Sequence, residues 1–172
     1  MGLLREDSER PRRDPAAGLA LRVGDWSLLG EAARAVRLAV FVDEQGIDPK
    51  LELDELDAGA VHAVAYDAQG TAIATGRLLP DARIGRMAVL ARARNRGVGA
   101  AILRALVAIA AARGDREVVL HAQRSAARFY AREGFREHGG EYLEAGIAHV
   151  TMTRALADAG APAPRPDPQA SE

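Results

Sequence analysis

The sequence predicts an α/β protein in which helices flank a mixed central sheet. Apolar runs of strand length alternate with stretches of helical periodicity, in the order β-α-β-β-β-α-β-α-β-β. A Gly-rich turn joins one of the short apolar runs to a long helical stretch rich in Ala and Leu. The chain has 172 residues, of which 48% are hydrophobic, and this is enough for one domain with a sizeable core.

The two ends of the chain differ from its middle. Residues 1–18 are charged and carry Pro11 and Pro15, and residues 158–172 hold proline at alternate positions. Neither end has the apolar residues needed to offset the entropy lost on ordering. We therefore expect two disordered tails around a folded domain at 19–157.

The first half of this domain is predicted to hold a strand, a helix, an acidic loop and a three-stranded meander. Asp25 is a good N-cap for a helix whose apolar residues continue through Val40. Turn residues at 67–70 separate two apolar runs, which predicts a hairpin. The expected strands are 19–23, 61–66, 72–79 and 84–89.

The second half continues with two helices and three strands. A helix at 102–112 follows the Gly-rich turn, and a β-branched run at 117–121 is typical of a buried strand. A short helix after Ser125 is closed by Gly134. The last expected elements are paired strands at 141–143 and 147–153.

Composition excludes several classes of function. A formal net charge of -1 argues against bulk binding to nucleic acid or to a membrane surface, and no apolar run approaches the length of a membrane span. We expect a cytoplasmic protein. The chain has no Cys and its four His are scattered, so we predict no metal site and no Cys acyl-enzyme.

The Gly-rich turn is predicted to bind an anion. Free backbone N–H groups at the start of a helix, together with the helix dipole, attract phosphate groups. The turn lacks the Lys and Ser or Thr of a P-loop, and it lacks the third Gly of the dinucleotide fingerprint. A pyrophosphate would fit here. The turn consists of Arg94, Asn95, Arg96, Gly97, Val98, Gly99 and Ala100.

This R-x-x-G-x-G turn resembles the coenzyme A pyrophosphate loop of the GNAT (GCN5-related) N-acetyltransferase superfamily. Downstream, residues 126–135 resemble the A-x-x-F-Y-x-x-x-G-F signature of the same family. Residues 37–45, 85–89 and 146–152 resemble an ElaA-like bacterial branch. The predicted order of strands and helices is also that of the GNAT fold.

The resemblance implies direct transfer of an acetyl group from acetyl-CoA to a primary amine, without a metal. It places the cosubstrate against the 94–100 turn and against the strand residues Met87, Ala88 and Val89. A backbone N–H near Val89 would polarise the thioester oxygen. Arg94 and Arg96 would contact phosphate, although arginine is frequent throughout this chain.

Tyr130 stands where the family's general acid stands, on the helix that faces the sulfur. Its alternative role is that of a core tyrosine beside Phe129. Two residues are candidates for the base that deprotonates the amine: Glu44, after the first helix, and His149, on the last strand. Glu44 could also be a solvated loop residue, and His149 could be structural.

Carboxylates gather between residues 43 and 57, and this acidic segment has two interpretations. It could attract a cationic amine, such as a polyamine, an amino sugar or a peptide amine, to the acceptor cleft. It could instead be a solvated loop. Its carboxylates are Asp43, Glu44, Asp48, Glu52, Asp54, Glu55 and Asp57.

Two further functions stay open at this point. Arg37, Phe41, the 52–57 run and the 76–80 run are similar to the front half of acyl-homoserine lactone synthases, although Ile47 stands where that family shows Trp. A non-catalytic regulator that binds acyl-CoA would carry the same turn. The sequence also leaves a homodimer open.

Overall fold

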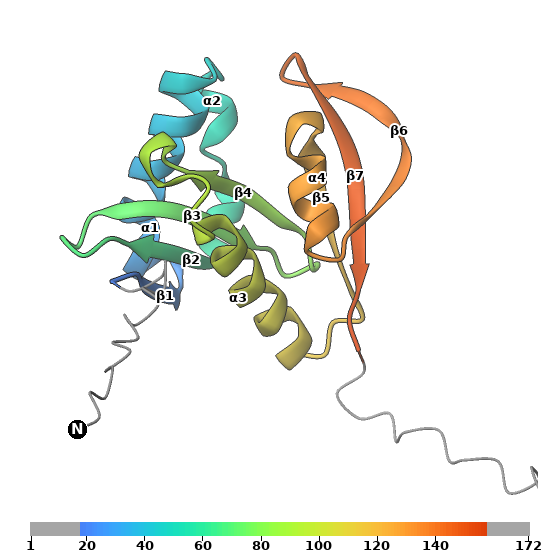
Figure 1. The fold of residues 1–172 in the computed structure, drawn as a ribbon, viewed down its shortest axis with the longest axis horizontal. Helices are drawn as coiled ribbons and strands as arrows, with labels where there is room; N and C mark the ends of the chain where they lie inside the picture. Colours follow the sequence, from blue (N-terminus) through green and yellow to red (C-terminus); the bar gives the residue numbers. More distant parts are fainter. Residues whose placement is uncertain (1–17, 158–172) are drawn as a thin grey trace, which may run out of the picture.

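The computed structural model describes residues 18–157 (Figure 1). The predictions of disorder in the two tails lie outside these residues, apart from Gly18. The strands are β1 (Ala20–Gly24), β2 (Val61–Tyr66), β3 (Ala72–Leu78), β4 (Ile84–Val89), β5 (Glu117–Gln123), β6 (Arg136–Glu144) and β7 (Ile147–Ala155). The helices are α1 (Trp26–Arg37), α2 (Pro49–Glu52), α3 (Val98–Ala112) and α4 (Ala127–Arg132). Short π or 3-10 segments are η1 (Leu38–Glu44), η2 (Glu55–Gly59), η3 (Ala91–Ala93) and η4 (Arg124–Ala126).

The strands form two antiparallel sheets that meet at one point. The first has the order β1-β2-β3-β4, and the second has the order β5-β7-β6. A parallel bridge between Arg83 and Val119 joins them, with the Val119 N–H donating to the carbonyl of Ala82 at 3.1 Å. This parallel contact makes the arrangement mixed, as predicted. Beyond it, β4 and β5 diverge.

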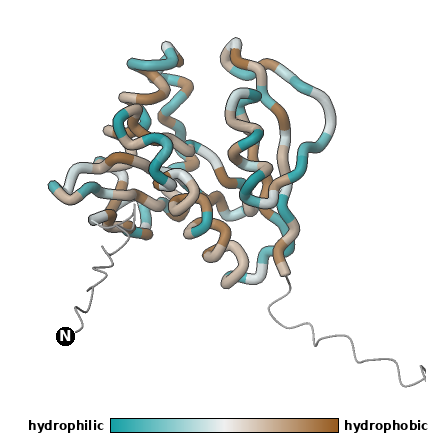
Figure 2. The backbone as a smooth tube through the Cα atoms, viewed as in Figure 1, coloured by the Kyte–Doolittle hydropathy of each residue, from teal (hydrophilic) through white to brown (hydrophobic). Residues whose placement is uncertain are grey.

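Helix α3 unites the two sheets around one core. Its buried residues Ile102, Leu103 and Leu106 belong to the same apolar cluster as Leu78 of β3 and Met152 of β7. In Figure 2 hydrophobic segments gather along α3, whereas β6 is mostly hydrophilic. Within the described part of the chain, no helix is long and apolar enough to cross a membrane.

Helix α1 covers the other face of the first sheet. Asp25 caps it as predicted, since its carboxylate accepts from the Leu28 N–H at 3.0 Å. Leu29 and Ala33 then pack on Val64 of β2. The two helices α1 and α3 therefore sandwich the four-stranded sheet.

The segment predicted as an acidic loop is largely helical, and this prediction was wrong. Helix α1 widens after Arg37 into η1, where the Gln45 N–H donates to the carbonyl of Val40 at 3.1 Å, one residue further back than in an α-helix. The short helices α2 and η2 follow, each capped by an aspartate, Asp48 or Asp54. The Asp48 and Asp54 carboxylates accept hydrogen bonds from N–H groups at the starts of these helices, so acidic residues favour helical turns here.

Strand β6 is longer than predicted and begins directly after Phe135. Its pairing with β7 shifts register between His138 and Tyr142, and Gly139 in this bulge has a φ of +70°. The pair Gly139-Gly140 concealed the strand, because glycine weakens a strand pattern and often marks a bulge.

Candidate active site

A cleft of about 1110 Å³ lies where the two sheets diverge. Residues of β4, the 94–100 turn and α3 line one part of it. Residues of η1, α2, β5, α4 and the β6–β7 hairpin line the rest. The structure thus brings Tyr130, Glu44 and His149 to the same cleft as the predicted pyrophosphate turn.

The 94–100 turn has the backbone geometry that an anion site needs. Gly97 is the N-cap of α3 with a φ of +76°, and no side chain caps the helix. The first helical bond at this end runs from the Ala101 N–H to the Gly97 carbonyl at 3.0 Å, so the N–H groups of Val98, Gly99 and Ala100 have no partner within the helix. These N–H groups are free to bind an anion.

The two glycines of the turn differ in their surroundings. A Cβ added at Gly97 would meet nothing within 4 Å, so the approach to its backbone is open. A Cβ at Gly99 would lie 3.3 Å from Cγ2 of Val89 and 3.5 Å from Cζ of Phe129. Gly99 therefore also lets α3 start close to β4 and α4.

Strand β4 directs one backbone N–H, that of Val89, toward the cleft. The Leu90 N–H donates to the Ile73 carbonyl at 2.9 Å, which makes these residues a hydrogen-bonded pair of the β3–β4 ladder. Val89, one residue earlier, pairs with Ala74 and must direct its N–H and C=O to the opposite edge. At that edge the Val89 carbonyl accepts from Nε of Arg94 at 3.1 Å, and the N–H faces the cleft. Met87 and Ala88 line the same cleft.

Tyr130 has a buried ring and an unpaired hydroxyl. Its ring makes edge contacts with Phe129 and Phe135, at centroid distances of 4.9 and 6.0 Å, and the residue is 8% exposed. Among the described residues its hydroxyl has no hydrogen-bond partner, and the residue lines the cleft. Burial raises the pKa of Tyr130 to about 12, so the phenol stays protonated at neutral pH.

His149 is oriented by its own strand and by the neighbouring one. Its Nδ1 lies 2.7 Å from the Ile147 carbonyl, which assigns the proton to Nδ1 and leaves Nε2 as the acceptor nitrogen. The ring stacks on Tyr142 at a centroid distance of 6.0 Å, and Nε2 lies 3.8 Å from Oε2 of Glu144. Tyr142 also hydrogen-bonds His121 through its hydroxyl.

Tyr142 and Glu144 are site residues that we did not predict from the sequence. Tyr142 stands directly opposite His149 in the β6–β7 register. Side chains opposite one another on neighbouring strands share a face, so the available signal was the pairing of this hairpin. The two glycines within β6 obscured that signal.

Glu44 does not stand free at the cleft but pairs with Arg94. The guanidinium donates to both carboxylate oxygens, at 2.6 and 2.7 Å, and both side chains are partly exposed. This hydrogen bonding from Arg94 lowers the pKa of Glu44 and makes it a weaker base. Next to it, Gln45 accepts from Nε2 of Gln123 at 2.8 Å, which links η1 to β5.

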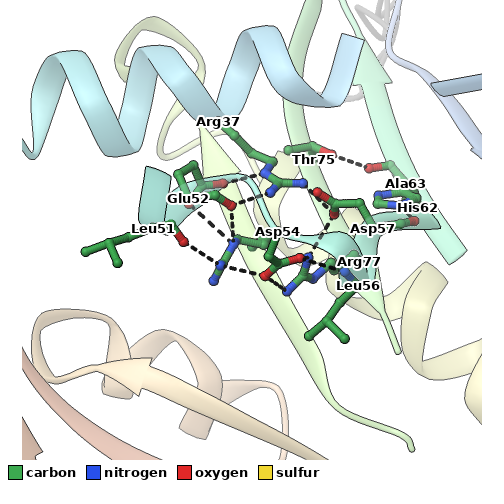
Figure 3. Close-up of polar contacts among 11 residues, drawn as sticks. Arg37, Leu51, Glu52, Asp54, Leu56, Asp57, His62, Ala63, Thr75 and Arg77 are labelled. Carbon is green, nitrogen blue, oxygen red and sulfur yellow. Dashed lines mark hydrogen bonds and ion pairs between the residues drawn. The ribbon is translucent and has the colours of Figure 1, made fainter. Parts of the chain in front are cut away.

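The acidic segment is neither a free negative surface nor a solvated loop, because arginines bind three of its carboxylates. Asp57 accepts at 2.8 Å from both Arg37 and Arg77 (Figure 3). Asp54 accepts from Arg77 at 2.6 and 2.9 Å and from Arg86 at 3.0 Å, and Arg37 also binds Glu52.

These six side chains form an interior ion network that holds α2 and η2 against β3 and β4. Arg37 and Asp57 are 1% and 3% exposed, so neither charge could be tolerated there without its partners. Burial raises the pKa of Glu52 even though Arg37 opposes the effect. Within the described residues one buried side-chain nitrogen lacks a partner, the Nε of Arg77.

The cleft gives the molecule the features of an enzyme that holds a phosphorylated acyl carrier. A turn whose N–H groups have no helical partner opens a helix, the Val89 N–H faces the gap between the two sheets, and a protonated phenol lines that gap. In the described part of the chain, no group of three or more His, Asp or Glu residues could hold a metal ion.

Comparison with known proteins gives the family. The profile of the acetyltransferase (GNAT) domain matches residues 31–156, and the chain belongs to this family of acyl-CoA-dependent acetyltransferases. Its sequence is 37% identical over 122 residues to the uncharacterised N-acetyltransferase YjcF of Bacillus subtilis. This match covers 69% of the present chain and 87% of YjcF.

Solved structures agree with this assignment. A putative N-acetyltransferase from Lactobacillus plantarum is 33% identical, with a TM-score of 0.75 over 81% of this chain and 99% of that one. Escherichia coli ElaA is 26% identical, with a TM-score of 0.70 over 79% of this chain and 99% of that one. The predicted GNAT fold and the resemblance to ElaA are confirmed.

Proposed function

We propose that this enzyme moves an acetyl group from acetyl-CoA directly to a primary amine of a cationic small molecule or peptide. The observation that carries the proposal is the convergence of the 94–100 turn, Tyr130 and His149 on one cleft. The turn binds the pyrophosphate through its free N–H groups, and Met87, Ala88 and Val89 form the adjoining wall.

The reaction needs a neutral amine, a polarised carbonyl and a stabilised leaving group. Nε2 of His149 accepts a proton from the ammonium, and the amine lone pair then attacks the thioester carbon. The Val89 N–H stabilises the oxyanion of the tetrahedral intermediate. The attacking nitrogen loses its second proton to water, and the intermediate collapses by breaking the carbon–sulfur bond. The products are the acetylated amine and the CoA thiolate.

Tyr130 donates a hydrogen bond to the sulfur as the thiolate leaves. A thiol has a pKa of roughly 8.5, below the value of about 12 for Tyr130. Complete proton transfer from the phenol is therefore uphill, and the main contribution of Tyr130 is a hydrogen bond that strengthens as negative charge develops on sulfur.

The preference for a cationic acceptor rests on an exposed carboxylate at the cleft. Glu144 lies beside His149 with a side chain that is 58% exposed, and it makes no ion pair with an arginine among the described residues. The interior carboxylates Glu52, Asp54 and Asp57 contribute little, because arginines neutralise them. The resemblance to acyl-homoserine lactone synthases includes Arg37 and Arg77 of the interior ion network. These two residues bind carboxylates of this chain, so that part of the resemblance concerns the fold.

Replacement of Gly97 by Val tests the cosubstrate site. We expect Gly97→Val to weaken binding of acetyl-CoA at least tenfold, measured by calorimetry, because a side chain there blocks approach to the backbone. Gly114→Val is the matched control: Gly114 also has a positive φ, +91°, and an open Cβ position, but it lies at the other end of α3. Equal affinities in the two folded variants would contradict the assignment of the turn.

A turnover screen tests the acceptor class. Wild-type protein is assayed with acetyl-CoA and a panel containing spermidine, glucosamine, a lysine-containing tripeptide and neutral or anionic amines. We expect the highest kcat/KM for a cationic member. A best substrate that is neutral or anionic would reject the preference, and binding of acetyl-CoA without turnover of any amine would favour a regulatory protein.

A further inference from the structure

The ion pair between Glu44 and Arg94 joins the acceptor side of the cleft to the cosubstrate side. Glu44 is the last residue of η1, and Arg94 is the first residue of the pyrophosphate turn, 50 positions later. The pair is bidentate, with Nη1 and Nη2 of Arg94 on the two carboxylate oxygens. Each residue lines the same cleft.

Both bidentate faces of the Arg94 guanidinium are engaged in this arrangement, although two of its five N–H groups have no partner among the described residues. Its Nε donates to the Val89 carbonyl at 3.1 Å while both terminal nitrogens donate to Glu44. The fork that matches a carboxylate also matches a phosphate. Nε and the Nη1/Nη2 fork are both occupied, so a pyrophosphate can make a bidentate pair with Arg94 only by displacing Glu44.

We propose that acetyl-CoA displaces Glu44 from Arg94, and that the released carboxylate binds the ammonium group of the acceptor. This inference rests on the proposed function, and it adds a specific role for Glu44 and an order of binding. Acetyl-CoA binds first, and the acceptor binds more tightly to the acetyl-CoA complex than to the free enzyme.

The position of Glu44 suits this role. Its neighbour Gln45 contacts Gln123 at 2.8 Å, and Gln123 stands opposite His149 in the β5–β7 register. The released carboxylate thus belongs to the part of the cleft that holds the base. Before release its charge is neutralised by Arg94, and after release it is free to attract a cation.

Glu44→Gln separates this role from a purely structural one. The glutamine cannot compete for Arg94 as an anion, so we expect CoA to bind about two- to fivefold more tightly at low salt, as is typical for the loss of an exposed ion pair. For the best amine of the panel KM should rise, whereas KM for acetyl-CoA should not. Unchanged or weaker CoA binding in this variant would overturn the proposal.

Asp67→Asn is the matched control. Asp67 forms an ion pair at 3.1 Å with Arg92, which lies two residues before the turn. Neither Asp67 nor Arg92 lines the cleft. We expect this variant to bind CoA and the amine as the wild type does. A gain in CoA affinity equal to that of Glu44→Gln would mean that only the net charge matters, and it would also overturn the proposal.

Carboxyl NMR of the full chain observes the release directly. The pKa of Glu44, lowered by Arg94 in the free protein, should rise when saturating CoA is added, and that of Asp67 should not. A Glu44 pKa that stays low in the CoA complex would refute the displacement. Failure of the wild type to bind CoA would instead refute the proposed function itself, so the two failures are distinguishable.

Discussion

At the scale of single residues, Tyr130 makes the sharpest kinetic prediction. Tyr130→Phe keeps the ring contacts with Phe129 and Phe135 and removes the hydroxyl. We expect kcat to fall about 10²–10³-fold, as for the loss of one preorganised hydrogen-bond donor to a developing negative charge, while acetyl-CoA affinity stays within about twofold. Steady-state kinetics with the best amine and calorimetry with CoA measure the two effects. Wild-type turnover in this variant would show that Tyr130 is only a core residue.

The raised pKa of Tyr130 also predicts a loss of stability in alkali. The pKa is about 12 in the folded protein and roughly 10 in the unfolded chain. Between these values the unfolded chain releases the proton and the folded protein keeps it, so rising pH favours unfolding; below pH 10 the contribution is fully present. We expect the wild type to lose about 1.4 kcal/mol relative to Tyr130→Phe between pH 9 and pH 11. Denaturant unfolding at each pH measures the two free energies of unfolding. A difference between the two proteins that stays the same from pH 9 to pH 11 would reject this shift of pKa.

At the scale of elements, the interior ion network holds α2 and η2 to the sheet. Asp57→Leu removes the carboxylate shared by Arg37 and Arg77 and leaves two buried cations short of a partner. We expect the free energy of unfolding to fall by about 3–5 kcal/mol. Asp81→Leu, which breaks the exposed pair with Arg83, should cost less than about 1 kcal/mol. Urea unfolding measures both, and equal costs would mean that burial of the network contributes nothing.

The contact between β3 and α3 makes a second element-scale prediction. A Cβ at Gly76 would lie 2.5 Å from Sδ of Met87 and 2.9 Å from Cγ2 of Ile102, which is closer than atoms can approach. We expect Gly76→Ala to destabilise the fold by about 1–3 kcal/mol because the side chains of Met87 and Ile102 must move out of their packed positions. Gly85→Ala is the control, since its Cβ would meet nothing within 4 Å. A thermal midpoint unchanged by Gly76→Ala would show that the core can relax around the methyl group.

At the scale of the whole molecule, the features that could be predicted from the sequence are those determined by residues close together in the chain. The Asp25 cap, the β2–β3 hairpin and the turn before α3 each follow from a few consecutive residues, and the structure contains them. The network of Arg37, Asp57 and Arg77 could not be predicted, because it depends on contacts between side chains 20 positions apart. The stacking of Tyr142 on His149 depends on the register of β6, which the glycine bulge conceals.

The π-helical turn of η1 sets the direction in which the side chains after α1 project from the helix axis. An α-helix turns about 100° per residue, so one residue more or fewer rotates the next side chains by that angle. A π-turn corresponds to one residue inserted into an α-helix. Shortening Leu38–Glu44 by one residue would therefore keep the length of the fold almost unchanged but swing Glu44 away from Arg94.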